Sequence, residues 1–222
     1  MKLPDLHRRL LSDALECGTT YGLVLAGGYA VQAHELVSRV SQDLDLATSA
    51  AADMDEITHA VVSGLQGKGW SIRIVEIAPR MARMVATDPV TRAQCEIDLL
   101  KEVFHRPPAY TAAGPTLSRD DAVGLKVRAL HDRGFPRDVI DVYSAHHLYT
   151  TAELEQLGAQ HEEDFDLDEL RGRLEAVTFT SDHEYSAYGL SDDQIAAVRA
   201  WAQRWQDDLG LRLAARYDGD SD

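Results

Sequence analysis

The sequence predicts an α/β (α+β) fold, in which a sheet flanked by helices is followed by a helical lobe. Through the first half of the chain, short apolar or alternating segments typical of strands are interspersed with patterns typical of helices. From residue 118 onward the patterns are helical. We therefore expect a sheet-containing core over residues 1–105 and a helical lobe over residues 118–215.

The segment 22–47 organises the predicted core. Its apolar run 23–26 stops at Gly27-Gly28, as expected of a buried strand that ends in a turn. Residues 30–37 then carry apolar side chains at helical spacing. A strand, a glycine pair and a helix thus follow one another, and a second strand comes next.

This second strand carries two acidic residues. Charged and apolar side chains alternate over residues 43–47, so Asp43 and Asp45 leave the strand on one face. Adjacent carboxylates repel unless a cation lies between them, and Mg²⁺ prefers oxygen ligands. Glycines permit close backbone approach, and a helix N-terminus presents N–H groups to a phosphate. The segment predicts a nucleoside triphosphate (NTP) site; the alternative is a helix–strand turn with two solvated aspartates.

The same spacing resembles a known family. Gly27-Gly28, fourteen further residues and then Asp43-x-Asp45 resemble the G-[GS]…D-x-D signature of DNA polymerase β-type nucleotidyltransferases, which implies a mixed sheet. The longer string AGGYAVQAHELVSRVSQDLDLAT is similar to the AbiEii/AbiGii (MenT-like) toxins. A serine commonly follows the first glycine in that branch. Gly28 stands there in this chain, so the resemblance implies a backbone contact to phosphate.

A third acidic residue is expected on a neighbouring strand. Residues 94–100 alternate, and Glu96 and Asp98 share one face without an obvious local partner. The resemblance implies that an acid on such a strand completes the site and often deprotonates the attacking hydroxyl. It points to Asp98, with Glu96 as a substitute. The alternative is a carboxylate in water on an edge strand.

The rest of the core follows from simple patterns. Residues 4–17 and 53–66 have the apolar stripe of amphipathic helices. Residues 70–77 and 81–87 are predicted as strands. Residues 104–117 contain three prolines and a glycine and are predicted as a loop between the lobes.

The helical lobe is expected to complete the active site. Ser118 is a good N-cap for a helix over residues 119–132. Lys126 and Arg133 lie seven positions apart, hence on one side of the helix and roughly 10 Å apart along its axis. That distance suits a triphosphate tail. The alternative for Lys126 is a side chain that extends to solvent.

The next predicted helix, residues 137–148, carries Asp138 and Asp141. Adjacent helices joined by a tight turn pack antiparallel, so we expect Asp141 to meet Lys126 or Arg133. The string K-x-R-A-L-x-x-R-x-x-x-R-D-x-x-D resembles a second block of the toxin family, in which a lysine and a later aspartate are needed for activity. The resemblance gives these roles to Lys126 and Asp141, and leaves Asp138 as a helix-start carboxylate.

The last third of the chain gives fold information only. Residues 151–177 and 192–208 are predicted as helices, the latter opened by a capping box of Ser191 and Gln194. Tryptophans at helical spacing in the latter predict core packing. The tail, residues 218–222, is predicted to be disordered.

Composition narrows the class of protein. The formal net charge of −15 argues against a protein that coats nucleic acid, although a local basic patch would still act, since charges are screened over about 8 Å. Cys17 and Cys95 form neither a disulfide framework nor a zinc-ligand spacing. No apolar run reaches the ~20 residues that cross a bilayer, and no signal-peptide core is present. We expect a cytoplasmic protein with no membrane partner.

The functional hypothesis is a nucleotidyltransferase that uses NTP with Mg²⁺ or Mn²⁺. The resemblance implies a toxin of a toxin–antitoxin system, which adds nucleotides to the 3′ end of tRNA, blocks translation and has a cognate antitoxin. Two alternatives stay open: an antibiotic adenylyltransferase, because cationic drugs are attracted to an acidic protein, and an inactive nucleotide-binding module. The expected metal ligands are Asp43, Asp45 and Asp98. The other expected site residues are Lys126 and Asp141 for catalysis and Gly27, Gly28, Lys126 and Arg133 for nucleotide binding.

Overall fold

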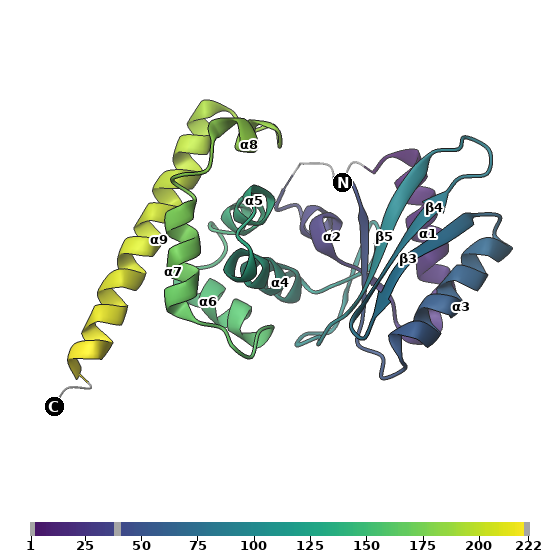
Figure 1. The fold of residues 1–222 in the computed structure, drawn as a ribbon, viewed down its shortest axis with the longest axis horizontal. Coiled ribbons are helices and arrows are strands. Elements are labelled where there is room, and N and C mark those ends of the chain that lie inside the picture. Colours follow the sequence, from purple (N-terminus) through teal and green to yellow (C-terminus); the bar gives the residue numbers. More distant parts are fainter. Residues whose placement is uncertain (1–2, 38–40, 220–222) are drawn as a thin grey trace. The chain divides into compact units, whose positions relative to one another are not determined.

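The computed structural model describes residues 3–37 and 41–219 and divides into two compact units (Figure 1). The units comprise residues 1–122 and 123–222, and the boundary falls inside helix α4, Arg119–Asp132. The first unit contains a seven-stranded mixed sheet, and the second is built of helices. The predicted α/β class is confirmed. None of the described helices has the length and apolar character needed to span a membrane.

The sheet of the first unit has the strand order β3-β4-β5-β2-β1-β7-β6. Its central pair, β2 and β5, is parallel, as is the pair β1 and β7, whereas the other neighbours are antiparallel. The strands are β1 Val24–Leu25, β2 Leu44–Thr48, β3 Ser71–Ala78, β4 Met81–Thr87, β5 Gln94–Lys101, β6 Ala109–Thr111 and β7 Gly114–Thr116.

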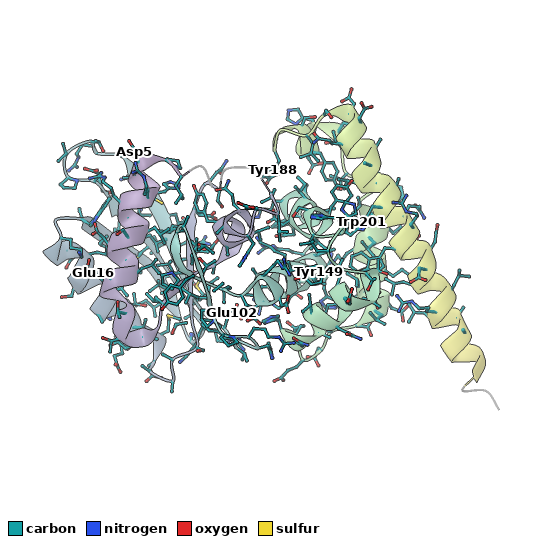
Figure 2. All side chains as sticks on the ribbon, turned by 180° about the vertical axis from the view of Figure 1, so that it is seen from behind. Asp5, Glu16, Glu102, Tyr149, Tyr188 and Trp201 are labelled. Atoms are coloured by element: carbon teal, nitrogen blue, oxygen red, sulfur yellow. The ribbon has the colours of Figure 1, made fainter. Side chains whose placement is uncertain are left out.

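Two helices, α1 (Asp5–Cys17) and α3 (Met54–Gly67), pack on one face of this sheet. Figure 2 shows α1 lying along the sheet, with Asp5 and Glu16 labelled near its ends. Alternate side chains of β2, β4 and β5 point into the core beneath these helices and are buried. The core residues contributed by these strands are Leu44, Leu46, Ala82, Met84, Ala86, Cys95, Ile97 and Leu99.

The predicted loop over residues 104–117 is wrong, because this segment forms the β6–β7 hairpin. Thr116 of β7 pairs with Leu25 of β1, and the Leu117 N–H donates to the Leu25 carbonyl over 2.9 Å. A buried two-residue strand such as β1 needs a hydrogen-bonding neighbour on each side. The proline-rich segment supplies the second neighbour and therefore belongs to the sheet.

The helix predicted over residues 30–37 is displaced. Helix α2 spans Gly27–Ala33, so the glycine pair lies in its first turn rather than before it. The helix ends because Glu35 adopts a left-handed backbone conformation, with φ of 61°. The other predicted helices and strands of this unit are confirmed to within one or two residues, except that Asp43 lies one residue before β2.

The second unit continues from α4 through five further helices. They are α5 Pro136–Ser144, α6 Thr151–Gln160, α7 Leu167–Ala176, α8 Asp182–Ser186 and α9 Asp192–Gly219. The predicted helices are confirmed, although α5 ends earlier than expected and α9 extends further. Residues 220–222 of the predicted disordered tail lie outside the described residues, whereas 218 and 219 end α9.

Helix α9 is fixed by buried aromatic and ionic contacts. Trp201, labelled in Figure 2, and Trp205 are buried, which confirms their predicted place in the core. The Trp205 Nε1–H donates to Glu155 of α6 over 2.8 Å, and the Arg212 guanidinium donates two bonds, of 2.6 and 3.0 Å, to the same carboxylate. Glu155 is thus a buried carboxylate with donors from two side chains of α9.

Candidate active site

An acidic cluster lies on the face of the sheet opposite α1 and α3. In the parallel pair β2–β5, Asp45 is directly opposite Asp98, and in the antiparallel pair β4–β5, Arg83 is directly opposite Asp98. Neighbouring strands lie about 4.8 Å apart, so these three side chains form one row across the sheet. The row brings together Asp45 and Asp98, two of the predicted catalytic carboxylates.

Asp43 belongs to the same electrostatic cluster. It lies just before β2, where the Ser41 hydroxyl donates to its Oδ1 over 2.9 Å. Its charge also acts on the Cys95 thiol. Burial, and then the negative charges of Asp43, Glu96 and Asp45, raise the pKa of Cys95 to about 12. A thiol with such a pKa stays protonated at neutral pH.

Gly27 lies against the Asp45 carboxylate. Its φ is +56°, and a Cβ built at this position would overlap the Asp45 side chain. The Ala26 N–H also donates to the Asp45 carbonyl over 2.9 Å, which ties the start of α2 to β2. Both the backbone conformation and the space therefore require glycine at position 27. Gly28 follows as a buried residue in the first turn of α2.

Arg83 is a member of this cluster that sequence reasoning missed. Its Nε donates to Asp98 Oδ1 over 2.8 Å and its terminal nitrogen donates to Oδ2 over 2.7 Å, while Nε lies 3.3 Å from Glu96. The expectation that Asp98 has no local partner is therefore wrong. The alternation of residues 81–87 places Arg83 on the outer face of β4, but the register that sets it opposite Asp98 comes from the folded sheet.

A hydrogen-bond chain supports the segment that leads to Asp43. The Tyr29 hydroxyl donates to the Ser41 carbonyl over 2.9 Å and lies 2.7 Å from His7 Nδ1. Since the hydroxyl proton is used for Ser41, His7 is assigned as the donor to Tyr29. Burial lowers the pKa of His7, with the charge of Asp43 opposing this shift. A neutral imidazole thus positions Tyr29.

The donor set of the cluster fits a hard divalent cation. Its acidic members offer carboxylate oxygens, and two of them face each other on adjacent strands. Within residues 3–37 and 41–219, however, no three His, Cys, Asp or Glu side chains lie together in a ready-made metal site. Both oxygens of Asp98 instead accept hydrogen bonds from Arg83. That Asp43, Asp45 and Asp98 are metal ligands stays a prediction.

Two ion pairs of the second unit involve fully buried carboxylates. Lys126 Nζ lies 3.0 Å from Asp141 Oδ2, and the Asp141 side chain is fully buried, which confirms the expected Lys126–Asp141 contact. Arg133 binds Asp138 instead, through bonds of 2.8 and 3.1 Å. Asp138 is likewise fully buried; it lies in the first turn of α5, as predicted for a helix-start carboxylate, and it has in addition the ion pair with Arg133. The Arg133–Asp138 ion pair thus connects the end of α4 with the start of α5 across the turn between them.

A mixed sheet that carries facing carboxylates beside a glycine turn is the arrangement expected of a polymerase β-type nucleotidyltransferase. Residues 9–211 match the model of the family described as nucleotidyl transferase AbiEii toxin, type IV TA system. The chain belongs to this family and is a nucleotidyltransferase. Membership implies an NTP substrate and a cognate antitoxin.

Two solved structures share the fold. MenT4, a nucleotidyltransferase toxin of Mycobacterium tuberculosis, is 15% identical, with a TM-score of 0.58 over 95% of this chain and 91% of that chain. JHP933 from Helicobacter pylori is 16% identical, with a TM-score of 0.53 over 99% of this chain and 100% of that chain. Among curated proteins, no sequence matches this chain.

Proposed function

We propose that the protein is a toxin that transfers nucleotides from NTP to the 3′ end of tRNA, with Mg²⁺ or Mn²⁺ as cofactor, and so blocks translation. The observation that carries this proposal is the row in which Asp45 faces Asp98 on adjacent parallel strands, with Gly27 against the Asp45 carboxylate. Family membership supports the toxin and nucleotidyltransferase parts of the proposal.

In the proposed reaction, the acceptor hydroxyl attacks the α-phosphorus, a new O–P bond forms, and the bond to the β-phosphate breaks to release pyrophosphate. Asp43, Asp45 and Asp98 would hold the divalent ions, which when bound neutralise phosphate charge and lower the pKa of the hydroxyl. Asp98 is the group that takes the hydroxyl proton. Most of the rate then comes from the positioning of the two substrates.

The glycine pair provides space for the triphosphate. A side chain at position 27 would overlap the Asp45 carboxylate and displace one of the groups that would hold the metal and its phosphates. Gly28, in the first turn of α2, has no side chain that would hinder an approaching phosphate. We therefore assign Gly27 and Gly28 to phosphate binding.

Lys126, Asp141 and Arg133 are assigned to the pyrophosphate that leaves. An ammonium has three donors, so the bond to Asp141 leaves Lys126 able to donate to phosphate as well. Asp141 is the group that fixes the lysine side chain. Arg133, which donates two bonds to Asp138, carries the second positive charge assigned to this anion.

The acceptor substrate is the part of the proposed reaction that an assay tests most directly. The net charge of −15 predicts weak, salt-sensitive binding of tRNA. The same charge favours the second candidate function, adenylylation of a cationic antibiotic such as an aminoglycoside. The two candidates share the cluster and differ only in the acceptor.

An assay with NTP labelled at the α-phosphate separates them. Purified protein is incubated with each NTP, Mg²⁺ or Mn²⁺, and either total tRNA or an aminoglycoside. The proposal predicts label on tRNA 3′ ends and none on the drug, with loss of labelling in Asp45→Asn. Label on the drug alone would establish the second candidate, and no transfer to any acceptor would leave a nucleotide-binding module as the better account.

A further inference from the structure

We propose that Arg83 is a resident counter-ion of the acidic cluster: it holds Asp98 while the metal is absent, and must release it when a divalent ion binds. This inference rests on the proposed function, because it assumes that Asp43, Asp45 and Asp98 form the metal site. In this role Arg83 is a positioning residue that makes metal binding weaker than the carboxylates alone would allow.

The register of the sheet gives the first argument. Asp98 lies on β5 with Arg83 on one neighbouring strand, β4, and Asp45 on the other, β2. Two hydrogen bonds, of 2.8 and 2.7 Å, connect both oxygens of Asp98 to the guanidinium. The Asp98 carboxylate is therefore engaged on the β4 side, away from Asp45. A shared metal with Asp45 requires this carboxylate to turn toward β2.

The charge balance gives the second argument. The guanidinium of Arg83 is shared among several carboxylates: it is hydrogen-bonded to Asp98, lies 3.3 Å from Glu96 and also interacts with the charge of Asp43. The hydrogen bonds that Arg83 donates to Asp98, and then the charges of Asp98, Glu96 and Asp43, raise the pKa of the guanidinium. A guanidinium stays charged at every physiological pH. It thus neutralises part of the cluster at rest and repels an incoming cation at the same carboxylate.

The released guanidinium needs another anion. A planar guanidinium binds phosphate through two parallel hydrogen bonds as it binds a carboxylate. In the proposed function the triphosphate is the anion that arrives together with the metal. Exchange of Asp98 for phosphate would make metal and NTP assist each other's binding, because each removes a cost that the other would otherwise meet.

Binding of Mn²⁺ to the full-length protein without nucleotide tests this inference. Free Mn²⁺ is measured by electron paramagnetic resonance for wild type, Arg83→Gln and the matched control Arg73→Gln. Arg73 is an exposed arginine on β3 opposite Val85, one strand further from Asp98. We expect Arg83→Gln to bind Mn²⁺ about tenfold more tightly than wild type, since it removes a competing cation. Arg73→Gln should bind like wild type.

Two further measurements test the same role of Arg83 independently. Addition of a non-hydrolysable NTP should tighten Mn²⁺ binding in wild type by a larger factor than in Arg83→Gln. Thermal unfolding should show Arg83→Gln less stable than wild type in EDTA and stabilised more than wild type by Mn²⁺. If Arg83→Gln does not fold, Arg83→Lys, which keeps the charge without the bidentate pair, is expected to have intermediate Mn²⁺ affinity.

The outcomes separate this inference from the proposed function. Equal or weaker Mn²⁺ binding by Arg83→Gln, with binding abolished by Asp45→Asn, would overturn the counter-ion role and keep the metal site. Mn²⁺ binding that is undetectable in every variant, or insensitive to Asp45→Asn, would overturn both.

Discussion

The two units treat buried charge in different ways. In the second unit, the buried carboxylates Asp141, Asp138 and Glu155 pair with Lys126, Arg133 and Arg212 respectively. In the row across the sheet of the first unit, by contrast, the guanidinium of Arg83 interacts with several carboxylates, Asp98 and Glu96 on β5 and Asp43 just before β2. Each of these buried carboxylates of the second unit thus has a different cation, whereas Asp98 and Glu96 of the first unit share Arg83.

This difference separates structural from catalytic charge. A matched buried pair satisfies itself, and removing one partner leaves an unpaired charge in the interior. Carboxylates that lie close together and share one guanidinium repel one another, and a divalent cation would reduce that repulsion. We therefore expect neutralising substitutions in the acidic cluster to reduce catalysis with little loss of stability, and those at Lys126 or Arg133 of the second unit to reduce stability as well as transfer.

The largest expected effect is on catalysis in the first unit. Asp45→Asn should reduce nucleotide transfer by at least about a hundredfold, because it removes charge that stabilises the transition state through the metal. The melting temperature should change little, because Asn has the size of Asp and the bond from the Ala26 N–H to the backbone carbonyl of residue 45 is kept. Transfer assays and thermal unfolding of the same preparation measure both. The control is Asp55→Asn, at an exposed position of α3, which should leave transfer unchanged. Unchanged turnover in Asp45→Asn would show that this carboxylate has no part in the mechanism.

The second effect is on stability in the second unit. Lys126→Ala leaves the Asp141 carboxylate fully buried without its partner and should lower the free energy of unfolding by about 3 kcal/mol or more. The double variant Lys126→Met, Asp141→Asn should recover most of this loss, as urea titrations would show. If that folded double variant still lacks transfer activity, Lys126 acts on substrate as well. A single variant as stable as wild type would contradict the charge-matching account.

Gly27→Ala tests the close approach between α2 and the acidic cluster. Its left-handed backbone should cost ~1–2 kcal/mol, and the new Cβ would displace the Asp45 carboxylate, so transfer should fall as well. Gly67→Ala, where a Cβ meets no other atom within 4 Å, serves as a control and should change neither property. Full activity in Gly27→Ala would show that the Asp45 carboxylate can be displaced without loss of function, which would contradict this assignment.

The smallest effect is a pH dependence of stability through His7. Burial lowers its pKa in the folded state, so below pH ~6.5 the unfolded chain binds a proton that the folded chain does not. This residue should therefore cost stability as the pH falls. Urea midpoints of wild type and His7→Gln at pH 7.5 and 5.5 measure it: the advantage of wild type should shrink at the lower pH, and a constant difference would count against a neutral buried imidazole.

Local patterns were enough to predict most elements and the acidic residues. The helical stripes of α1 and α3 and the alternation of β4 and β5 are local properties of the sequence, and so is the capping box of Ser191 and Gln194, which the structure confirms with bonds of 2.9 and 3.4 Å. These features depend on residues close in the chain, which is why sequence reasoning finds them.

The features that were missed depend on distant partners. β6 and β7 are three-residue strands in a proline-rich segment, and they exist because β1 needs a neighbour. The contact of Arg83 with Asp98 depends on the register of β4 against β5, which is known only from the folded sheet. Likewise, the ion pair between Asp138 and Arg133 depends on the turn between α4 and α5 and could not be predicted from the position of Asp138 alone. Pairing between segments fixes these details, and no local pattern encodes it.

Sequencing of tRNA 3′ ends from cells that produce the protein tests the central claim most directly. Wild type should leave one or a few extra nucleotides on mature tRNA ends and arrest growth, whereas Asp45→Asn at equal abundance should leave the ends intact and the cells growing. Growth arrest by wild type with unmodified tRNA ends, or extended ends in the Asp45→Asn cells, would contradict the account.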